Sequence, residues 1–164
     1  KSIGAKMIGT FSTDEKASLA KQNWCAFNVN YKQNDVHSSV LKLTNNEGVN
    51  VVYDGVGKDT FDISLKCLKF RGLMVSFGQS SGMVNDVNLH STFNPKSLYY
   101  TRPTLMHYIR NSEELTECSN KLFSKIKNKE IKPNIFKKFK LSEASEAHKL
   151  IQSRNSVGSI ILCP

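Results

Sequence analysis

A phosphate-binding turn is the first chemistry that residues 48–61 suggest. The stretch reads GVNVVYDGVGKDTF, in which the apolar run 49–53 is followed by Asp54 and a Gly-Val-Gly turn, residues 55–57. A strand that ends in glycines and leads into a helix commonly cradles a phosphate with its backbone amides. The dinucleotide fingerprint is G-x-G-x-x-G, however, and Thr60 stands where the third glycine belongs. The turn is therefore a decayed fingerprint, or the true fingerprint lies elsewhere.

A second turn of the same kind is SFGQSSG, residues 76–82, which closes the apolar run that begins at residue 72. Backbone amides in a turn rich in glycine and serine can face an anionic ligand. Two such turns at the ends of neighbouring strands favour a cofactor that lies across both. For each turn taken alone, the other interpretation is a tight connection between a strand and a helix.

The segment 12–16 is a third candidate for phosphate binding. The β-prone segment 5–11 ends just before Ser12, and Lys16 follows one helical turn later. A hydroxyl and an ammonium group at the end of such a strand suit the 2′-phosphate of NADP, whereas an acidic residue there would suit the ribose of NAD. The two acidic residues between them are better placed to interact with the helix dipole. The alternative interpretation is a capped helix with an exposed lysine.

The histidines and cysteines form no recognisable metal or nucleophile motif. No C-x-x-C, H-E-x-x-H or G-x-S-x-G occurs, so zinc-ribbon, thioredoxin and hydrolase interpretations lack support and no metal site is expected. Scattered thiols favour a reducing compartment, here the cytoplasm. No apolar run of about 18 residues is present, so no membrane span is expected. The residues concerned are His37, His90, His107, His148, Cys25, Cys67, Cys118 and Cys163.

The chain is strongly basic, with 23 Lys and Arg against 14 Asp and Glu, a net charge of +9. Such a balance permits nucleic-acid binding through phosphate neutralisation. The basic residues are mostly lysines, however, and many lie in one stretch, residues 125–140, and no RNA-binding signature with interleaved aromatic residues accompanies it. We therefore favour a solvated surface over a nucleic-acid site.

Strand-like and helix-like segments alternate through the first half of the chain. Ser12 and Glu15 form a potential capping box for the first helix, and Gly48 suits the end of the second. The alternation predicts an α/β fold with a parallel, doubly wound sheet, whose ligands bind at the carboxyl ends of the strands. The expected strands are 5–11, 26–31, 49–54 and 72–78, and the expected helices are 12–23, 34–48 and 58–70.

The second half is less regular. Asn111 is predicted to cap the second part of a helical region, with Glu114 three residues later, and Ser142 is predicted to cap a later helix. The expected segments are a long loop 80–97, a strand 97–103, a two-part helical region 104–128, a strand 135–141, a helix 142–155 and a strand 157–163.

Three sequence blocks carry a resemblance to a known family. They are D-x-V-G-x-D-T, beginning at Asp54; R-G-x-x-V-S-F-G, beginning at Arg71; and Y-x-T-R-P, beginning at Tyr99. Together they closely resemble the NADPH-dependent quinone oxidoreductases, the zinc-free, zeta-crystallin-like branch of the medium-chain dehydrogenase/reductases. The resemblance covers nearly all 164 residues, and the closing SRNSVGSIIL is similar to the C-terminus of that family.

The resemblance implies the C-terminal part of such an enzyme. The expected fold is a Rossmann-like doubly wound parallel sheet that lacks its first strand and the N-terminal GroES-like catalytic domain. The family's phosphate loop would precede residue 1, and the Gly-Val-Gly turn would follow the fourth strand, near the nicotinamide end of the cofactor. In the strand order 3-2-1-4-5-6, loss of the first strand leaves its two neighbours without ladder partners. Residues 1–129 would form the partial cofactor-binding domain, and residues 130–164 would return to the catalytic domain.

The resemblance also implies which residues bind NADPH. The adenosine 2′-phosphate would be held by Ser12, Lys16, Tyr31 and Arg154. The turns on the adenine, ribose and nicotinamide side would be formed by Asp54, Gly55, Val56, Gly57, Phe77, Gly78, Gln79 and Ser80. No catalytic side chain and no metal ligand is expected among the 164 residues.

The implied activity is direct hydride transfer from NADPH to a quinone or enone. The edge strand 97–103 would pair two copies into a homodimer, and no membrane partner is expected. Because a central strand and the phosphate loop would be absent, we expect the isolated chain to be a weak enzyme. Two alternatives stay open: an enone or enoyl reductase of the same branch, and a non-enzymatic protein of this type that binds the cofactor or RNA.

Overall fold

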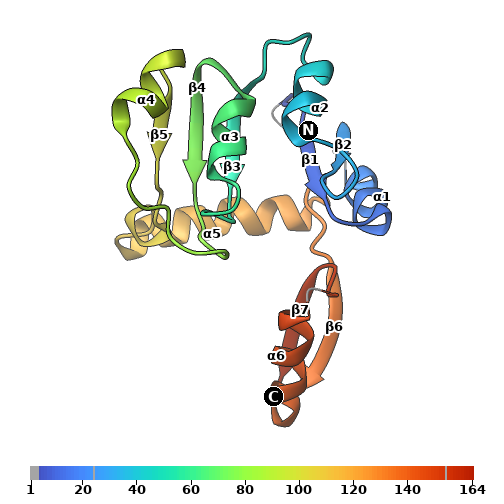
Figure 1. The fold of residues 1–164 in the computed structure, drawn as a ribbon. Coiled ribbons are helices and arrows are strands. Elements are labelled where there is room, and N and C mark those ends of the chain that lie inside the picture. The colour runs from blue at the N-terminus through green and yellow to red at the C-terminus, as the bar shows by residue number, and fades with distance from the viewer. Residues whose placement is uncertain (1–3, 24, 154) are drawn as a thin grey trace. The chain divides into compact units, whose positions relative to one another are not determined.

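The computed structural model describes residues 4–23, 25–153 and 155–164. The chain forms two compact units, Lys1–Tyr108 and Ile109–Pro164. The elements of both units are labelled in Figure 1. The predicted boundary after residue 129 marks the point from which the chain would return to the catalytic domain. This boundary stays a prediction.

The first unit begins with a parallel β-α-β arrangement. Strand β1 (Ile8–Phe11) pairs in parallel with β2 (Phe27–Asn30), and helix α1 (Asp14–Gln22) connects them. The predicted capping box is wrong in its first residue. Thr13 has an extended backbone and is the N-cap, because its hydroxyl accepts the Lys16 amide at 3.3 Å. The helix therefore begins one residue later than a Ser12 cap would place it.

The next helix, α2 (Val36–Leu43), is shorter than predicted at both ends. The Asp35 carboxylate caps it by accepting the Ser38 amide at 2.7 Å. Its C-cap is Thr44, so Gly48 is not the residue that ends the helix. Gly48 has φ +85°, and a Cβ there would lie 2.6 Å from the Cys67 carbonyl oxygen. This glycine is needed because the chain passes close to the neighbouring strand just before β3.

Strands β3 (Val49–Asp54), β4 (Leu68–Ser76) and β5 (Tyr99–Thr101) form a second parallel sheet in that order. Helix α3 (Phe61–Cys67) lies between β3 and β4 in the chain and is shorter than the predicted 58–70. The apolar side chain of Leu68 was expected to continue the helix, but it begins β4 instead and is fully buried. With it, Phe61, Leu65 and Met74 form a buried hydrophobic cluster against this sheet.

The region predicted as a long loop, residues 80–97, contains two short helices. They are α4 (Leu89–Phe93) and the 3₁₀ turn η1 (Asn94–Lys96). Asn88 caps α4 by accepting the Ser91 amide at 3.0 Å. Phe93 packs edge-on against Tyr100 of β5, with the ring centroids 5.8 Å apart. That tertiary contact stabilises a helix too short to be recognised from periodicity.

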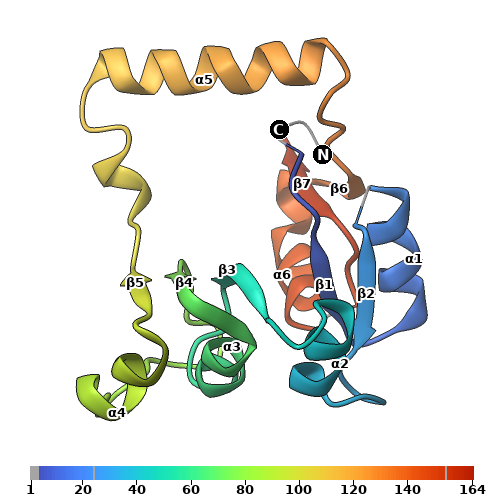
Figure 2. The same cartoon turned by 90° about the horizontal axis from the view of Figure 1, so that it is seen from above.

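The two sheets of the first unit are separate, as Figure 2 shows. Among the described residues, β1 pairs only with β2, and β3 pairs only with β4. These pairings agree with the order 3-2-1-4-5-6 if β2 and β1 take the places of strands 3 and 2, and β3, β4 and β5 take those of strands 4, 5 and 6. The loss of ladder partners around strand 1 stays a prediction. The fold is α/β, parallel and Rossmann-like.

The second unit contains α5 (Ser112–Lys127) and a parallel β-α-β arrangement of β6 (Ile135–Lys140), α6 (Ala144–Gln152) and β7 (Ser159–Cys163). Phe139 and Ala147 are its buried apolar residues among those described. Ser142 does not cap α6; it lies within a 3₁₀ turn, η3 (Leu141–Glu143), that precedes the helix. Across the described chain, every helix is too short or too polar to cross a membrane.

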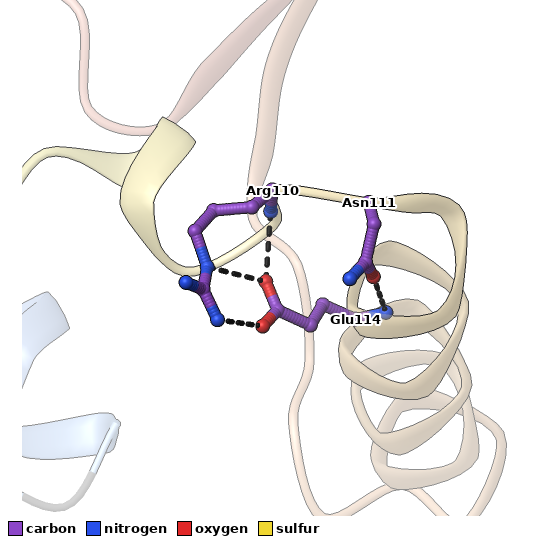
Figure 3. Close-up of polar contacts among 3 residues, drawn as sticks. All are labelled: Arg110, Asn111 and Glu114. Atoms are coloured by element: carbon purple, nitrogen blue, oxygen red, sulfur yellow. Dashed lines mark hydrogen bonds and ion pairs between the residues drawn. The ribbon is translucent and has the colours of Figure 1, made fainter.

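The predicted start of α5 is confirmed and is reinforced by an ion pair. The Asn111 side chain accepts the Glu114 amide at 2.8 Å. The Glu114 carboxylate in turn accepts the backbone amide of Arg110 at 2.8 Å and its guanidinium at 2.6 Å (Figure 3). Hydrogen bonds from Arg110 lower the pKa of Glu114. The Glu114 side chain thus joins the residues that precede α5 to its first turn.

Candidate cofactor-binding site

The Asp54 carboxylate organises the turn between β3 and α3. Asp54 ends β3, and only 4% of its surface is exposed. Its Oδ1 accepts the backbone amides of Val56 at 2.8 Å and Gly57 at 3.1 Å. The Thr60 hydroxyl donates to both carboxylate oxygens, at 2.9 and 2.8 Å, and the Ser64 hydroxyl donates to Oδ2 at 2.7 Å.

These hydrogen bonds keep the carboxylate ionised. Burial by itself raises the pKa of Asp54, but the bonds from Ser64, Gly57, Thr60 and Val56 together outweigh burial and leave the pKa below its usual value. Both oxygens are occupied inside the turn, so the carboxylate acts as the acceptor that shapes it. A direct contact between Asp54 and a cofactor stays a prediction.

The turn after β4 is hydrogen-bonded to the turn after β3. The Phe77 amide donates to the Asp54 carbonyl at 2.9 Å, and the Ser81 amide donates to the Val56 carbonyl at 2.9 Å. In the opposite direction, the Lys58 amide donates to the Gly82 carbonyl at 3.2 Å. We call residues 54–58 and 76–82 together the double turn. The structure thus brings together the two glycine-containing turns that the sequence predicted to lie side by side.

Glycines are required in the double turn because its two halves approach closely. A Cβ at Gly78 would lie 2.5 Å from the Gly55 carbonyl oxygen, and a Cβ at Gly57 would lie 2.7 Å from the Gly82 carbonyl oxygen. Gly57 also has φ +91°, a backbone conformation that favours glycine. The Gly-x-Gly spacing therefore serves packing between turns, and the residue in the third-glycine position, Thr60, is used as a hydrogen-bond donor to Asp54. These contacts account for the departure from the dinucleotide fingerprint.

The double turn presents a mixed apolar and polar surface. Phe77 is 59% exposed and Val56 is 38% exposed, and Gln79 and Ser80 are also exposed. The Gln79 side-chain oxygen accepts a hydrogen bond from the Arg102 guanidinium at 2.6 Å. Arg102 follows β5 directly and was not among the predicted site residues. Its signal was present in the Y-x-T-R-P block, but no spacing rule connected it with Gln79.

Two of the predicted 2′-phosphate residues, Ser12 and Tyr31, directly follow the ends of β1 and β2. The Tyr31 amide donates to the Phe11 carbonyl at 3.0 Å, so Tyr31 and Ser12 follow adjacent strand ends. Ser12 is half-buried and Tyr31 is 51% exposed. Lys16 lies in the first turn of α1, and Arg154 lies outside the described residues. The strands that lead to Ser12 and Tyr31 belong to a different sheet from the strands that lead into the double turn. Among the described residues, no strand pairing joins the two sheets.

Asp14, an acidic residue of α1 close to Ser12 in the chain, is hydrogen-bonded to the Asn30 side chain. The Asn30 side-chain amide, at the end of β2, donates to the Asp14 carboxylate at 3.3 Å. The hydroxyl groups of Ser12 and Tyr31, with the Lys16 ammonium group, have the chemistry of a phosphate site. The donor set at the end of this sheet therefore fits a dinucleotide phosphate, and the exposed Phe77 and Gln79 fit the less charged part of such a cofactor.

The cysteines and histidines do not form a metal centre in the described part of the chain, where no group of three or more His, Cys, Asp or Glu could hold an ion. All four cysteines are free thiols. Burial raises the pKa of the Cys67 thiol to about 11, so this group stays protonated at neutral pH and is a poor nucleophile.

Comparisons with known proteins agree with this geometry. The family described as "Zinc-binding dehydrogenase" matches residues 1–125. Quinone oxidoreductase 1 of Escherichia coli is 46% identical over the whole chain, and 2-haloacrylate reductase of a Burkholderia species is 40% identical over 99% of it. The crystal structure of E. coli quinone oxidoreductase complexed with NADPH superimposes with a TM-score of 0.93 at 46% identity, over 99% of this chain and 51% of that one. The chain spans about half the length of these relatives, 51% and 49%.

Proposed function

The chain belongs to the zinc-binding dehydrogenase family, and we propose on that basis that it forms the cofactor-binding part of an NADPH-dependent quinone oxidoreductase. The observation that carries the proposal is the double turn, which occurs in a chain 46% identical to a quinone oxidoreductase whose crystal structure contains NADPH. The recognition of the quinone oxidoreductase branch is confirmed by the same similarity.

In this proposal, each group of residues has a distinct part. Ser12, Lys16 and Tyr31 bind the 2′-phosphate and select NADPH over NADH, with Arg154 as a further predicted contact. Charge-assisted hydrogen bonds from a lysine suit a phosphate group, which carries negative charge that an unphosphorylated ribose lacks. The side chains of the double turn orient the remainder of the cofactor, and the Asp54 carboxylate keeps that turn in shape.

NADPH supplies a hydride, which with one proton converts a quinone to its hydroquinone and leaves NADP⁺. The described residues contribute binding and orientation. Exposed Phe77 offers an apolar surface that would help to keep water from a bound cofactor. We assign no proton transfer to any of these side chains.

We further propose that two copies pair through the edge strand 97–103. Within the described residues, the second edge of β5 has no partner strand, and Tyr99 on this strand is 63% exposed. An unpaired edge of this type can extend a sheet across a two-fold axis. A cytoplasmic location and independence from zinc stay predictions for the whole protein.

A carbon–carbon double-bond reductase is the second candidate. The 40% identity to 2-haloacrylate reductase of a Burkholderia species favours it. In that reaction the hydride and a proton add across the double bond of an enone or haloacrylate rather than to a quinone.

The rate of NADPH oxidation by the complete protein, which includes the catalytic domain, tests the proposed function when 1,4-naphthoquinone is compared with 2-chloroacrylate. We expect faster turnover with the quinone and little turnover with NADH. Preference for the acrylate would support the second candidate instead. Salt-sensitive RNA binding without any NADPH binding would contradict both and support the non-enzymatic alternative.

A further inference from the structure

We propose that Arg102 is a positioning residue for the cofactor, which acts by fixing the orientation of the Gln79 amide. The inference rests on the proposed function, because it assigns a role within the same site. Its basis is the 2.6 Å hydrogen bond from the Arg102 guanidinium Nη2 to Gln79 Oε1. The two residues are separated by 23 positions in the chain and follow neighbouring strands, β4 and β5.

The backbone of Gln79 is already fixed by the double turn. Its carbonyl accepts the Gly82 amide at 2.9 Å. Its Cα lies 3.1 Å from the position that a Cβ on Gly57 would occupy, so the two segments are in close contact. The remaining freedom is in the side chain, which is exposed and would otherwise sample several rotamers. The bond from Arg102 removes that freedom.

The chemistry of the pair also decides which end of the amide is available. A guanidinium has only hydrogen-bond donors, so it can face the oxygen of the Gln79 amide but not its NH₂ group. Among the hydrogen bonds of the described residues, none uses Gln79 Nε2. The amide nitrogen is therefore left to donate to an acceptor on a ligand, such as a carboxamide, ribose or phosphate oxygen.

Arg102 lies where two proposed features meet. It directly follows β5, whose outer edge we propose as the dimer contact, and it bonds to the turn that we propose to contact the cofactor. Thr101 pairs with Val75 near the end of β4, so Arg102 is placed by the sheet itself. A side chain placed by a strand can orient a turn residue more accurately than a loop residue could.

The test measures the Kd for NADPH and the thermal midpoint without cofactor. We expect Arg102→Met to raise the Kd roughly fivefold, as for one lost hydrogen bond, and to leave the midpoint unchanged. Arg102→Lys, which keeps a donor without the planar fork, should recover part of the affinity. Arg110→Met is the matched control, because it removes another exposed arginine that pairs with Glu114 in the second unit, and it should leave the Kd unchanged.

A double-mutant cycle shows whether Arg102 acts through Gln79. Gln79→Leu should weaken binding by a similar factor, and Arg102→Met should then cause no further loss. Additive effects, or an unchanged Kd in Arg102→Met, would overturn the inference while the proposed function stands. If Arg102→Met does not fold, wild-type affinity in Gln79→Leu would also overturn it. Absence of NADPH binding by the wild-type protein would overturn the proposed function and this inference together.

Discussion

The Ser64 hydroxyl in α3 donates a 2.7 Å hydrogen bond to Oδ2 of Asp54, which ends the preceding strand. The bond joins helix α3 to the carboxylate that shapes the turn before it. Together with the hydrogen bonds from Thr60 and from the backbone amides of Val56 and Gly57, it offsets the free-energy cost of burying the Asp54 charge at the end of a parallel strand.

Removal of this hydroxyl should destabilise the first unit. We expect Ser64→Ala to lower the free energy of unfolding by about 1–2 kcal/mol, because a charged acceptor loses one of its donors. Urea unfolding monitored by circular dichroism measures the change. Ser18→Ala is the control, since Ser18 is an exposed serine within α1. Equal stabilities for the two variants would show that the bond contributes nothing.

Asp54 should also make stability depend on pH. Its folded-state pKa lies below the ordinary value of 3.8, so its contribution is fully present above that value and is lost as the pH falls through the folded pKa. The expected result is a falling free energy of unfolding below about pH 4. In Asp54→Asn, which is less stable at neutral pH, this part of the pH profile should be flatter. An identical acid profile in both proteins would disprove the assignment.

The glycines of the double turn should differ in their tolerance of a methyl group. A Cβ at Gly78 would lie 2.5 Å from the backbone oxygen of Gly55, so Gly78→Ala should cost about 2 kcal/mol or more. The three heavy atoms nearest to a Cβ at Gly55 would all belong to the ring of Phe77, the first at 3.0 Å, and that ring is exposed and can move. Gly55→Ala should therefore cost less than about 1 kcal/mol. Thermal or urea unfolding distinguishes the two, and the reverse order would contradict the close approach of the turns.

Lys16 should determine the choice between NADPH and NADH. We expect Lys16→Met to weaken NADPH binding by about tenfold, which corresponds to the loss of one charge-assisted contact to phosphate. NADH binding should change little, because NADH lacks that phosphate. Isothermal titration measures both affinities, and Lys21→Met near the end of the same helix is the control. Equal losses for the two cofactors would place Lys16 outside the 2′-phosphate site.

The parallel α/β arrangement was predictable because its signals are local. Apolar runs such as Val49–Asp54 ended in turn residues, and a side-chain cap such as Asn111 marked a helix start. The adjacency of the two turns followed from the strand order, since parallel neighbours present the same ends together.

The features that sequence reasoning missed depend on tertiary contacts. Leu68 reads as helix by spacing, but complete burial in the sheet core makes it the first residue of β4. The sequence did not predict helix α4, because the stability of this helix depends on the packing of Phe93 against Tyr100. Arg102 was missed as a site residue because its hydrogen bond to Gln79 spans two strands, and no sequence period encodes such a pair.

The most direct test of the account is a thermal-shift titration of this chain with NADPH and, separately, with NADH. A ligand that binds only the folded state raises the unfolding midpoint as its concentration rises. We expect the midpoint to rise with NADPH at concentrations where NADH has little effect. A midpoint that does not move with NADPH, or that moves equally with both cofactors, would contradict the claim that these residues form an NADPH site.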